Sequence, residues 1–153
     1  MTEFCIVELK FLGVSFYSIW CTDENDYFLA SENKIVCFRR RELAEEYILE
    51  RTVSGASFTS FDFDQLDYKN CSDYLGKWNI IDDLSNTLKI DFIGSHDEYT
   101  GLYSKFVYGA NIPALNVSNK KYIPVFDVKE QRQIKNVTKD MIKILKLALE
   151  IKG

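Results

Sequence analysis

The sequence predicts an α+β protein, in which an N-terminal antiparallel β-meander packs with about four helices, the last of them long. Up to Phe38, short apolar runs alternate with polar turns, which is typical of consecutive antiparallel strands. Farther along, apolar residues recur at intervals of three and four, as in amphipathic helices. Because 153 residues suffice for one core and no linker or repeat interrupts them, we expect a single domain spanning 1–153.

The first strand is indicated by strict alternation. Val7, Leu9 and Phe11 alternate with Glu8 and Lys10, so one face of this strand should be buried. Polar turns at 22–26 and 31–33 separate the segments that follow. Further strands are predicted at 16–21, 27–30 and 35–38.

A helix opening at Arg39–Arg41 should follow the meander, because Leu43, Ala44, Tyr47 and Ile48 recur at helical spacing. Three cations at a helix N-terminus oppose the helix dipole, so they do not serve helix stability. The simpler interpretation is that their stems cover apolar surface; the alternative is that they bind an acidic group. Another strand is predicted at 58–63.

Two middle helices carry N-terminal signals. Ser72 is a candidate cap for the first, and Ser95 with Glu98 has the spacing of a capping box for the second. Gly109 is expected to stop the second helix. The apolar faces are predicted to comprise Leu75, Trp78, Ile81, Leu84 and Leu88 in the first, and Tyr99, Leu102, Tyr103, Phe106 and Val107 in the second.

The last helix is predicted to start at Asp127, which forms a second capping box with Glu130. Its apolar residues alternate at spacings of three and four, so one wide face should be buried. These residues are Ile134, Val137, Met141, Ile144, Ala148 and Ile151. The outward side should carry Lys135, Lys139, Lys143 and Lys146, a solvated stripe.

The sequence offers no catalytic set. His96 is the one histidine, the four cysteines form no Cys-x-x-Cys pair, and no phosphate-binding glycine loop occurs. Neighbouring acids such as Asp62 with Asp64, or Asp82 with Asp83, lack the supporting groups that a metal-dependent nuclease requires. We therefore expect a protein that is not an enzyme, with no metal, no cofactor and reduced thiols.

Charge and hydropathy limit the partners. The formal net charge of -4 argues against nucleic acid and is compatible with a basic protein partner. No apolar stretch approaches the length of a membrane span, so no membrane partner is expected. Without a secretion signal, the expected location is cytoplasmic.

Four segments carry a family resemblance. They are Phe61–Leu66, Trp78–Leu84, Tyr103–Ala114 and Tyr122–Phe126, and they follow a strand-rich half that contains Trp20. Together they resemble the immunity proteins encoded beside polymorphic bacterial toxins, including those of contact-dependent growth inhibition. The basic triplet Arg39–Arg41 departs from the acidic helix start expected there.

The resemblance implies a protein that binds one cognate toxin domain, commonly a nuclease, and occludes its active site or substrate surface. A nuclease is basic because its substrate is polyanionic, so exposed acids with an aromatic neighbour are the expected contacts. The candidate partner-binding residues are Asp23, Glu24 and Asp26 in the first turn, and Asp62, Asp64, Asp67 and Tyr68 in the central segment.

Two other classes remain open from sequence. One is a small-ligand-binding or regulatory domain with a pocket among the aromatic residues, and the other is an enzyme of unfamiliar chemistry. A secreted toxin encoded next door would favour the immunity protein, whereas metabolic neighbours would favour the alternatives.

Overall fold

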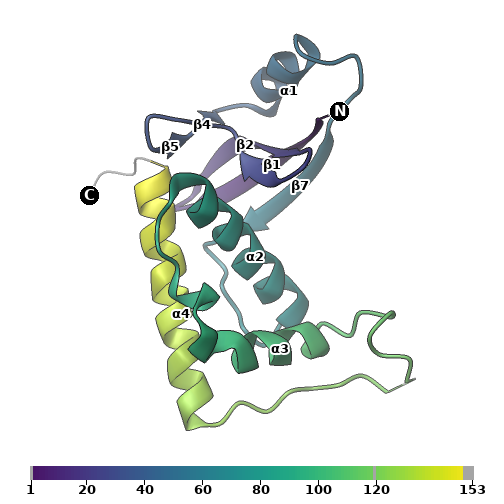
Figure 1. Cartoon of the computed structure of the whole chain (residues 1–153), viewed down its shortest axis with the longest axis vertical. Helices are drawn as coiled ribbons and strands as arrows, with labels where there is room; N and C mark the ends of the chain where they lie inside the picture. The colour runs from purple at the N-terminus through teal and green to yellow at the C-terminus, as the bar shows by residue number, and fades with distance from the viewer. Residues whose placement is uncertain (1, 119, 150–153) are drawn as a thin grey trace.

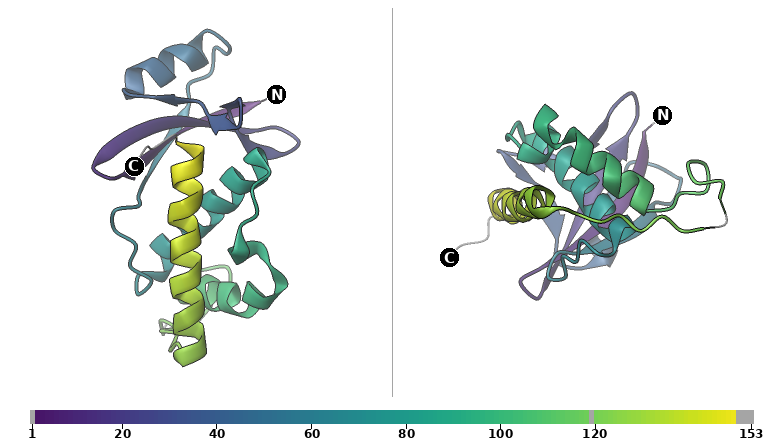
Figure 2. Two further views of the ribbon diagram at one scale, coloured as in Figure 1. Left: turned by 90° about the vertical axis from the view of Figure 1, so that its left-hand side faces the viewer. Right: turned by 90° about the horizontal axis from the view of Figure 1, so that it is seen from below.

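The computed structural model describes residues 2–118 and 120–149 and has an α+β architecture (Figure 1). A sheet lies across the molecule, with helix α1 on one side of it and helices α2 and α4 on the other (Figure 2). Ile151, predicted on the apolar face of the last helix, lies outside the described residues. No helix in the described part of the chain combines the length and apolar character that a membrane span requires.

The main sheet has the strand order β3-β2-β1-β7, with β6 also paired to β2. Strands β1 (Glu3–Phe11) and β2 (Val14–Thr22) form a long antiparallel hairpin, and β3 (Asp26–Phe28) continues the meander. The short strand β6 (Cys37–Phe38) pairs with the middle of β2. These pairings confirm the predicted meander as far as β3.

Strand β7 (Ser57–Asp62) makes the sheet mixed, because it pairs with β1 in parallel. A parallel neighbour needs a connection that crosses the sheet, and helix α1 (Arg41–Leu49) lies in that connection. The sequence predicted the strand but not its direction, since periodicity carries no information on orientation. β7 is an edge strand of the sheet.

Both faces of β1 are covered, whereas the alternation predicted one. Val7 and Leu9 belong to the large core shared with α2 and α4. On the opposite face Ile6 is 1% exposed and packs in a smaller cluster with Ala44 and Ile48 of α1. Glu8 and Lys10 lie on the same face as Ile6, beyond the part that α1 covers. Because they are polar, the sequence does not reveal that this face is buried at Ile6.

A separate two-stranded ribbon consists of β4 (Ala30–Ser31) and β5 (Lys34–Ile35). Glu32 and Asn33 join them with φ of 52° and 66°, the left-handed conformation of a tight hairpin turn. The turn predicted at 31–33 is therefore confirmed.

Helix α2 (Cys71–Leu88) buries the predicted face, with Trp78, Ile81 and Leu84 all at most 2% exposed. Its N-cap is Asn70, whose side chain accepts a hydrogen bond from the Asp73 backbone N–H at 3.2 Å. The prediction of Ser72 as the cap was wrong by two residues.

The capping box predicted at Ser95 was also wrong. Two short 3-10 helices, η1 (Ile93–Ser95) and η2 (Asp97–Tyr99), precede α3 (Thr100–Gly109). The Ser95 hydroxyl donates to the Phe92 carbonyl at 2.7 Å and so turns back into the preceding segment. The predicted apolar face is nevertheless correct, since Leu102 and Phe106 are buried.

Gly109 is the last residue of α3, but it does not stop the helix by a left-handed turn, as was predicted. A Cβ at this position would lie 2.7 Å from the Cys71 sulfur and 3.0 Å from Pro124, so the residue is small because two segments pass close to it. The left-handed residue is Asn111, with a φ of 53°.

Helix α4 (Val128–Ala148) starts with the predicted capping box, since Asp127 accepts from the Glu130 N–H at 2.8 Å and Glu130 accepts from the Asp127 N–H at 3.0 Å. The predicted apolar residues within it are buried, and Lys135, Lys139, Lys143 and Lys146 are exposed.

Burial raises the pKa of Cys37 to about 12, and all four cysteines are free thiols.

An irregular segment connects α3 to α4 and runs along the end of the helical layer that is distant from the sheet (Figure 1). Asn111 joins its start to Tyr122. Its side-chain oxygen accepts from the Tyr122 N–H at 2.7 Å, and its amide nitrogen donates to the Tyr122 and Gly109 carbonyls, both at 3.0 Å.

Candidate functional site

The turn between β2 and β3 presents three exposed acids, Asp23, Glu24 and Asp26. One Asp23 oxygen accepts from the Asn25 backbone N–H at 3.2 Å, and the other accepts from the Tyr27 hydroxyl at 3.1 Å. The hydrogen bond from Asn25 is the main reason that the pKa of Asp23 is lowered. Asp23 is therefore charged and held in place at neutral pH.

Two hydrogen bonds tie this turn to helix α2. The Phe28 N–H donates to the Thr87 hydroxyl at 3.0 Å, and the Trp20 indole N–H donates to the Asp83 carboxylate at 3.2 Å. They place Asp83 of α2 beside the turn. Asp82 precedes Asp83 in the helix and acts on it through its charge, but its own side chain lines a hollow with His96 and Tyr103. We call the set Asp23, Glu24, Asp26, Asp82 and Asp83 the acidic face.

Asp83 is the most perturbed carboxyl of the acidic face. Burial raises its pKa to about 6, the Trp20 hydrogen bond opposes this rise, and the charges of Asp26 and Asp82 add to it. Burial also raises the pKa of Asp82. Burial is thus the main cause of both raised values, and neighbouring negative charge adds to it only at Asp83.

No salt bridge neutralises the acidic face among the residues that the structure describes. The ion pairs there lie elsewhere: Arg41–Glu45, Arg51–Glu50, Lys77–Asp73, His96–Asp91 and Lys105–Glu130. The Arg41 guanidinium also stacks over the Phe58 ring at 3.9 Å, so this member of the basic triplet has an intramolecular contact.

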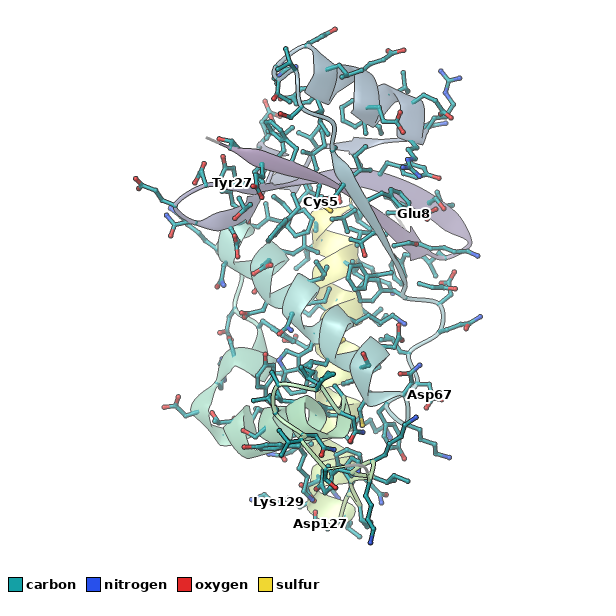
Figure 3. All side chains as sticks on the ribbon, turned by 90° about the vertical axis from the view of Figure 1, so that its right-hand side faces the viewer. Cys5, Glu8, Tyr27, Asp67, Asp127 and Lys129 are labelled. Carbon is teal, nitrogen blue, oxygen red and sulfur yellow. The ribbon has the colours of Figure 1, made fainter. Side chains whose placement is uncertain are left out.

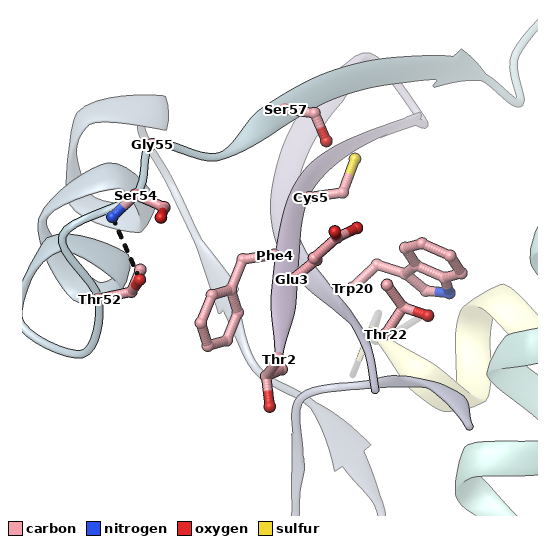
Figure 4. Close-up of a pocket in the computed structure, with 10 residues that line it drawn as sticks. All are labelled: Thr2, Glu3, Phe4, Cys5, Trp20, Thr22, Thr52, Ser54, Gly55 and Ser57. Atoms are coloured by element: carbon pink, nitrogen blue, oxygen red, sulfur yellow. Dashed lines mark hydrogen bonds between the residues drawn. The ribbon is translucent and has the colours of Figure 1, made fainter. Parts of the chain in front are cut away.

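Beside the acidic face the sheet edge is hollowed. Pairing of β7 with β1 begins only at Ser57 opposite Cys5, so the start of β1 extends beyond it. A cavity of about 320 Å³ occupies this place, and we call it the notch (Figure 4). Its lining comprises Thr2, Glu3, Phe4, Cys5, Trp20, Thr22, Thr52, Ser54, Gly55 and Ser57.

The structure gives the central group of predicted residues intramolecular roles. Asp64 accepts from the backbone N–H groups of Leu12 and Gly13 at 2.7 and 2.9 Å, and so closes the β1–β2 turn. Asp62 accepts from the Asp64 N–H at 2.9 Å, and Asp67 from that of Lys69 at 2.9 Å. The Tyr68 ring packs edge-on against Phe126, 5.8 Å between centroids.

The two predicted groups do not come together. Asp64 lies at the turn between β1 and β2, whereas Asp23 follows the other end of β2. The length of β2 separates them by roughly 25 Å, at about 3.3 Å per residue. Figure 3 shows this separation, with Tyr27 beside the first group and Asp67 in the second. A compact site can contain only one of them.

Among the residues that the structure describes, the candidate catalytic side chains are engaged in other contacts. His96 contacts Asp91 at 2.7 Å on the surface, and the neighbouring Ser95 hydroxyl is bonded to a carbonyl rather than to the imidazole. Asp91 is the main reason that the pKa of His96 is raised. Within residues 2–118 and 120–149, no three His, Cys, Asp or Glu side chains converge as metal ligands.

Sequence reasoning missed Glu3, Asp82 and Asp83 as members of one surface with the first turn. Asp82 and Asp83 were considered only as a chelating pair. The usable signal was Trp20, a strand residue with an indole N–H that needs an acceptor when the ring is packed. Nothing in the spacing of the chain shows that this acceptor is 63 residues away.

No protein-family model, curated protein or solved structure matches this chain at a significant level. Similarity therefore gives no family and no function here. What the protein does must be inferred from its own residues, and the acidic face with its notch is the most distinctive arrangement that they form.

Proposed function

We propose that the protein is an immunity protein, which binds a cognate toxin domain and occludes its active site or substrate surface. The acidic face is the observation that supports this most. Five carboxylates belong to this face, none of them forms a salt bridge within the described part of the chain, and the pKa of one is raised to about 6. Such a surface repels itself in the free protein and is relieved by a basic partner.

The proposed partner is a basic toxin domain, commonly a nuclease, because an enzyme that acts on nucleic acid carries a cationic surface. An acidic inhibitor competes with the substrate for that surface. The proposed setting is the cytoplasm of the producing cell. Catalysis forms no part of this proposal, and neither do a cofactor, a metal, a membrane or a nucleic acid.

The test is co-expression with the toxin domain encoded beside the gene. We expect cells to survive and the two proteins to elute together from a sizing column. Asp26→Lys should weaken protection, and Lys143→Glu, on the outward side of α4, should leave it unchanged. Cell death beside soluble, folded protein, with no complex on the column, would exclude the proposal.

The experiment also distinguishes the two groups of acids. If Asp26→Lys abolishes protection and Asp62→Lys does not, the acidic face is the contact surface. The reverse result would move the contact to the segment after β7. Each variant needs a thermal melt as a control, because Asp62 holds the Asp64 backbone.

A second candidate function is a small-ligand-binding domain, and the notch is the observation that favours it. Phe4 and Trp20 both line this cavity. A ligand that raises the melting temperature at micromolar concentration in the absence of any toxin would favour this alternative.

An enzymatic role can be tested separately. We expect no cleavage of DNA or RNA by the purified protein with Mg²⁺ or Mn²⁺. Cleavage that is lost in both Asp82→Asn and Asp62→Asn protein would contradict this.

A further inference from the structure

We propose that the notch is a binding site for a single guanidinium group, and that an arginine side chain of the partner occupies it. The preference of the notch for a guanidinium follows from the residues that line it. The source of the arginine rests on the proposed function, and the experiments below separate the two.

The shape of the notch suits one long side chain. It arises because the β1–β7 ladder starts at Cys5 and Ser57, so that the backbone at Glu3 and Phe4 is not covered by β7. Its lining extends around the edge of β1. Phe4 and the loop residues Thr52, Ser54 and Gly55 lie on one side of the strand, and Glu3, Cys5, Trp20 and Thr22 lie on the other, where the guanidinium is proposed to bind (Figure 4). The notch volume of about 320 Å³ equals the space of about ten water molecules.

The charge of the notch selects a cation. Among the described residues of its lining, Glu3 alone has a charged side chain, and it is exposed. Its side chain lies beside those of Cys5, Trp20 and Thr22 in the close-up (Figure 4). An anion would meet the Glu3 carboxylate, and no lysine or arginine is among the described residues of the lining.

Trp20 contributes an aromatic wall of fixed orientation. Its indole N–H is already bonded to Asp83 at 3.2 Å, so the ring offers the notch its apolar surface rather than a hydrogen-bond donor. A cation near an aromatic ring is attracted to the π face. Behind that wall lie Asp83 and Asp26, which extend the negative potential beyond Glu3.

These features favour guanidinium over ammonium. A guanidinium is planar and weakly hydrated, stacks on an aromatic ring and binds a carboxylate through two parallel hydrogen bonds. The hydroxyl groups of Thr22 and Ser57 provide further acceptors at the wall. Arginine is also among the residues in which the binding energy of interfaces concentrates.

The chemistry can be tested without a toxin. Backbone and indole N–H signals are followed by NMR while N-acetyl-L-arginine amide is added, with N-acetyl-L-citrulline amide as the neutral isostere. We expect saturable shifts of the Trp20 indole and of the Glu3 and Cys5 amides. A Kd on the order of 1 mM is expected for so small a ligand. The citrulline compound should give no saturable shifts.

Two variants make this test specific. Glu3→Gln should weaken arginine amide binding by about tenfold, the loss of a charge-assisted hydrogen bond. Glu32→Gln, an exposed acid in the β4–β5 turn, should leave it unchanged. Equal binding of the citrulline compound, or equal binding by Glu3→Gln protein, would overturn the site.

The source of the guanidinium is tested with the toxin domain. If the partner inserts an arginine, Glu3→Gln should raise the dissociation rate of the complex, and excess arginine amide should compete with the toxin domain. Normal toxin binding by a Glu3→Gln protein that has lost arginine amide binding would overturn the assignment to the partner. In that case the proposed immunity function would still stand.

Discussion

Asp83 shows at the scale of one residue how a partly buried charge affects the stability of this protein. Its carboxyl is partly buried between Trp20 and the charges of Asp26 and Asp82, which raises its pKa. An isosteric amide would keep an acceptor for the indole and lose the charge. A protein selected only for stability would have no reason to keep an acid there.

We predict that Asp83→Asn stabilises the protein at neutral pH. The native pKa of about 6 exceeds the ordinary value of 3.8, so the native state holds the proton more tightly and stability falls as pH rises through this window. The Asp83→Asn variant does not lose this stability. The difference amounts to roughly 1 kcal/mol of unfolding free energy after solvent screening is allowed for.

The measurement is the melting temperature of both proteins from pH 4 to pH 7.5. The advantage of Asp83→Asn should grow between pH 4 and pH 6.5 and then level off. A difference that is constant over this range would show that the Asp83 charge is not destabilising. We expect the same variant to bind the toxin domain more slowly.

Single residues were also where the sequence was most misleading. Asp62, Asp64 and Asp67 read as exposed loop acids, and a strand alternation cannot show that Asp64 folds back onto the backbone at Leu12 and Gly13. The link between Trp20 and Asp83 is equally invisible, since it joins a strand to a helix. The acids of the first turn were predictable because the turn is local.

At the scale of elements, helix α3 contains two glycines in different surroundings. A Cβ on Gly109 would meet Cys71 and Pro124, and a Cβ on Gly101 would meet nothing within 4 Å. The same substitution in the same helix therefore has opposite consequences.

We predict that Gly109→Ala destabilises the protein by about 1–3 kcal/mol through overpacking. Gly101→Ala should be neutral or stabilise it by up to about 1 kcal/mol, because alanine restricts the unfolded chain and suits a helix. Urea denaturation measures both. Similar effects at the two positions would contradict the close approach of α3, α2 and the segment at Pro124.

Helix α4 permits a second comparison, between neighbouring residues. Ile144 is 1% exposed and Lys143 is exposed. Ile144→Ala should cost about 2–5 kcal/mol because it leaves a cavity, and Lys143→Ala should change stability by less than about 0.5 kcal/mol. Equal losses in chemical denaturation would mean that the buried face of the helix is misassigned.

Sequence patterns predicted the helices and strands better than they predicted the contacts of single residues. Helix faces and strands follow from periodicity, and the capping box at Asp127 was found because its two partners are three residues apart. Helix α2 and the start of α3 show the limit. Asn70 and Ser72 are both good caps, and Ser95 has a second acceptor at Phe92 that spacing does not reveal.

At the scale of the whole molecule, charge is unevenly distributed. The acidic face lies at the β2–β3 end of the sheet, whereas four lysines line the outward side of α4. A partner that approaches the acidic face is steered by its own positive charge. The same separation discourages binding through α4.

If the proposed toxin partner binds the acidic face, we predict that association slows as salt is added, because ions screen the attraction between the two surfaces. Asp26→Lys should reduce the association rate and flatten its salt dependence, and Lys143→Glu should do neither. Surface-based binding measurements from 50 to 500 mM NaCl give both quantities. An association rate independent of salt would argue for a contact outside the acidic face.

The hydrogen bonds of the Asn111 side chain have a consequence for where the chain can vary in length. This side chain joins Gly109 to Tyr122, and within the interval Asn116 also donates to the Asn111 side-chain oxygen at 2.8 Å, so an insertion should keep Asn116. Lengthening such a closed loop costs little, about 0.6 kcal/mol for each doubling. The interval between Asn111 and Tyr122 is therefore the natural place to insert an epitope or a fluorescent reporter, at the end of the molecule farthest from the sheet.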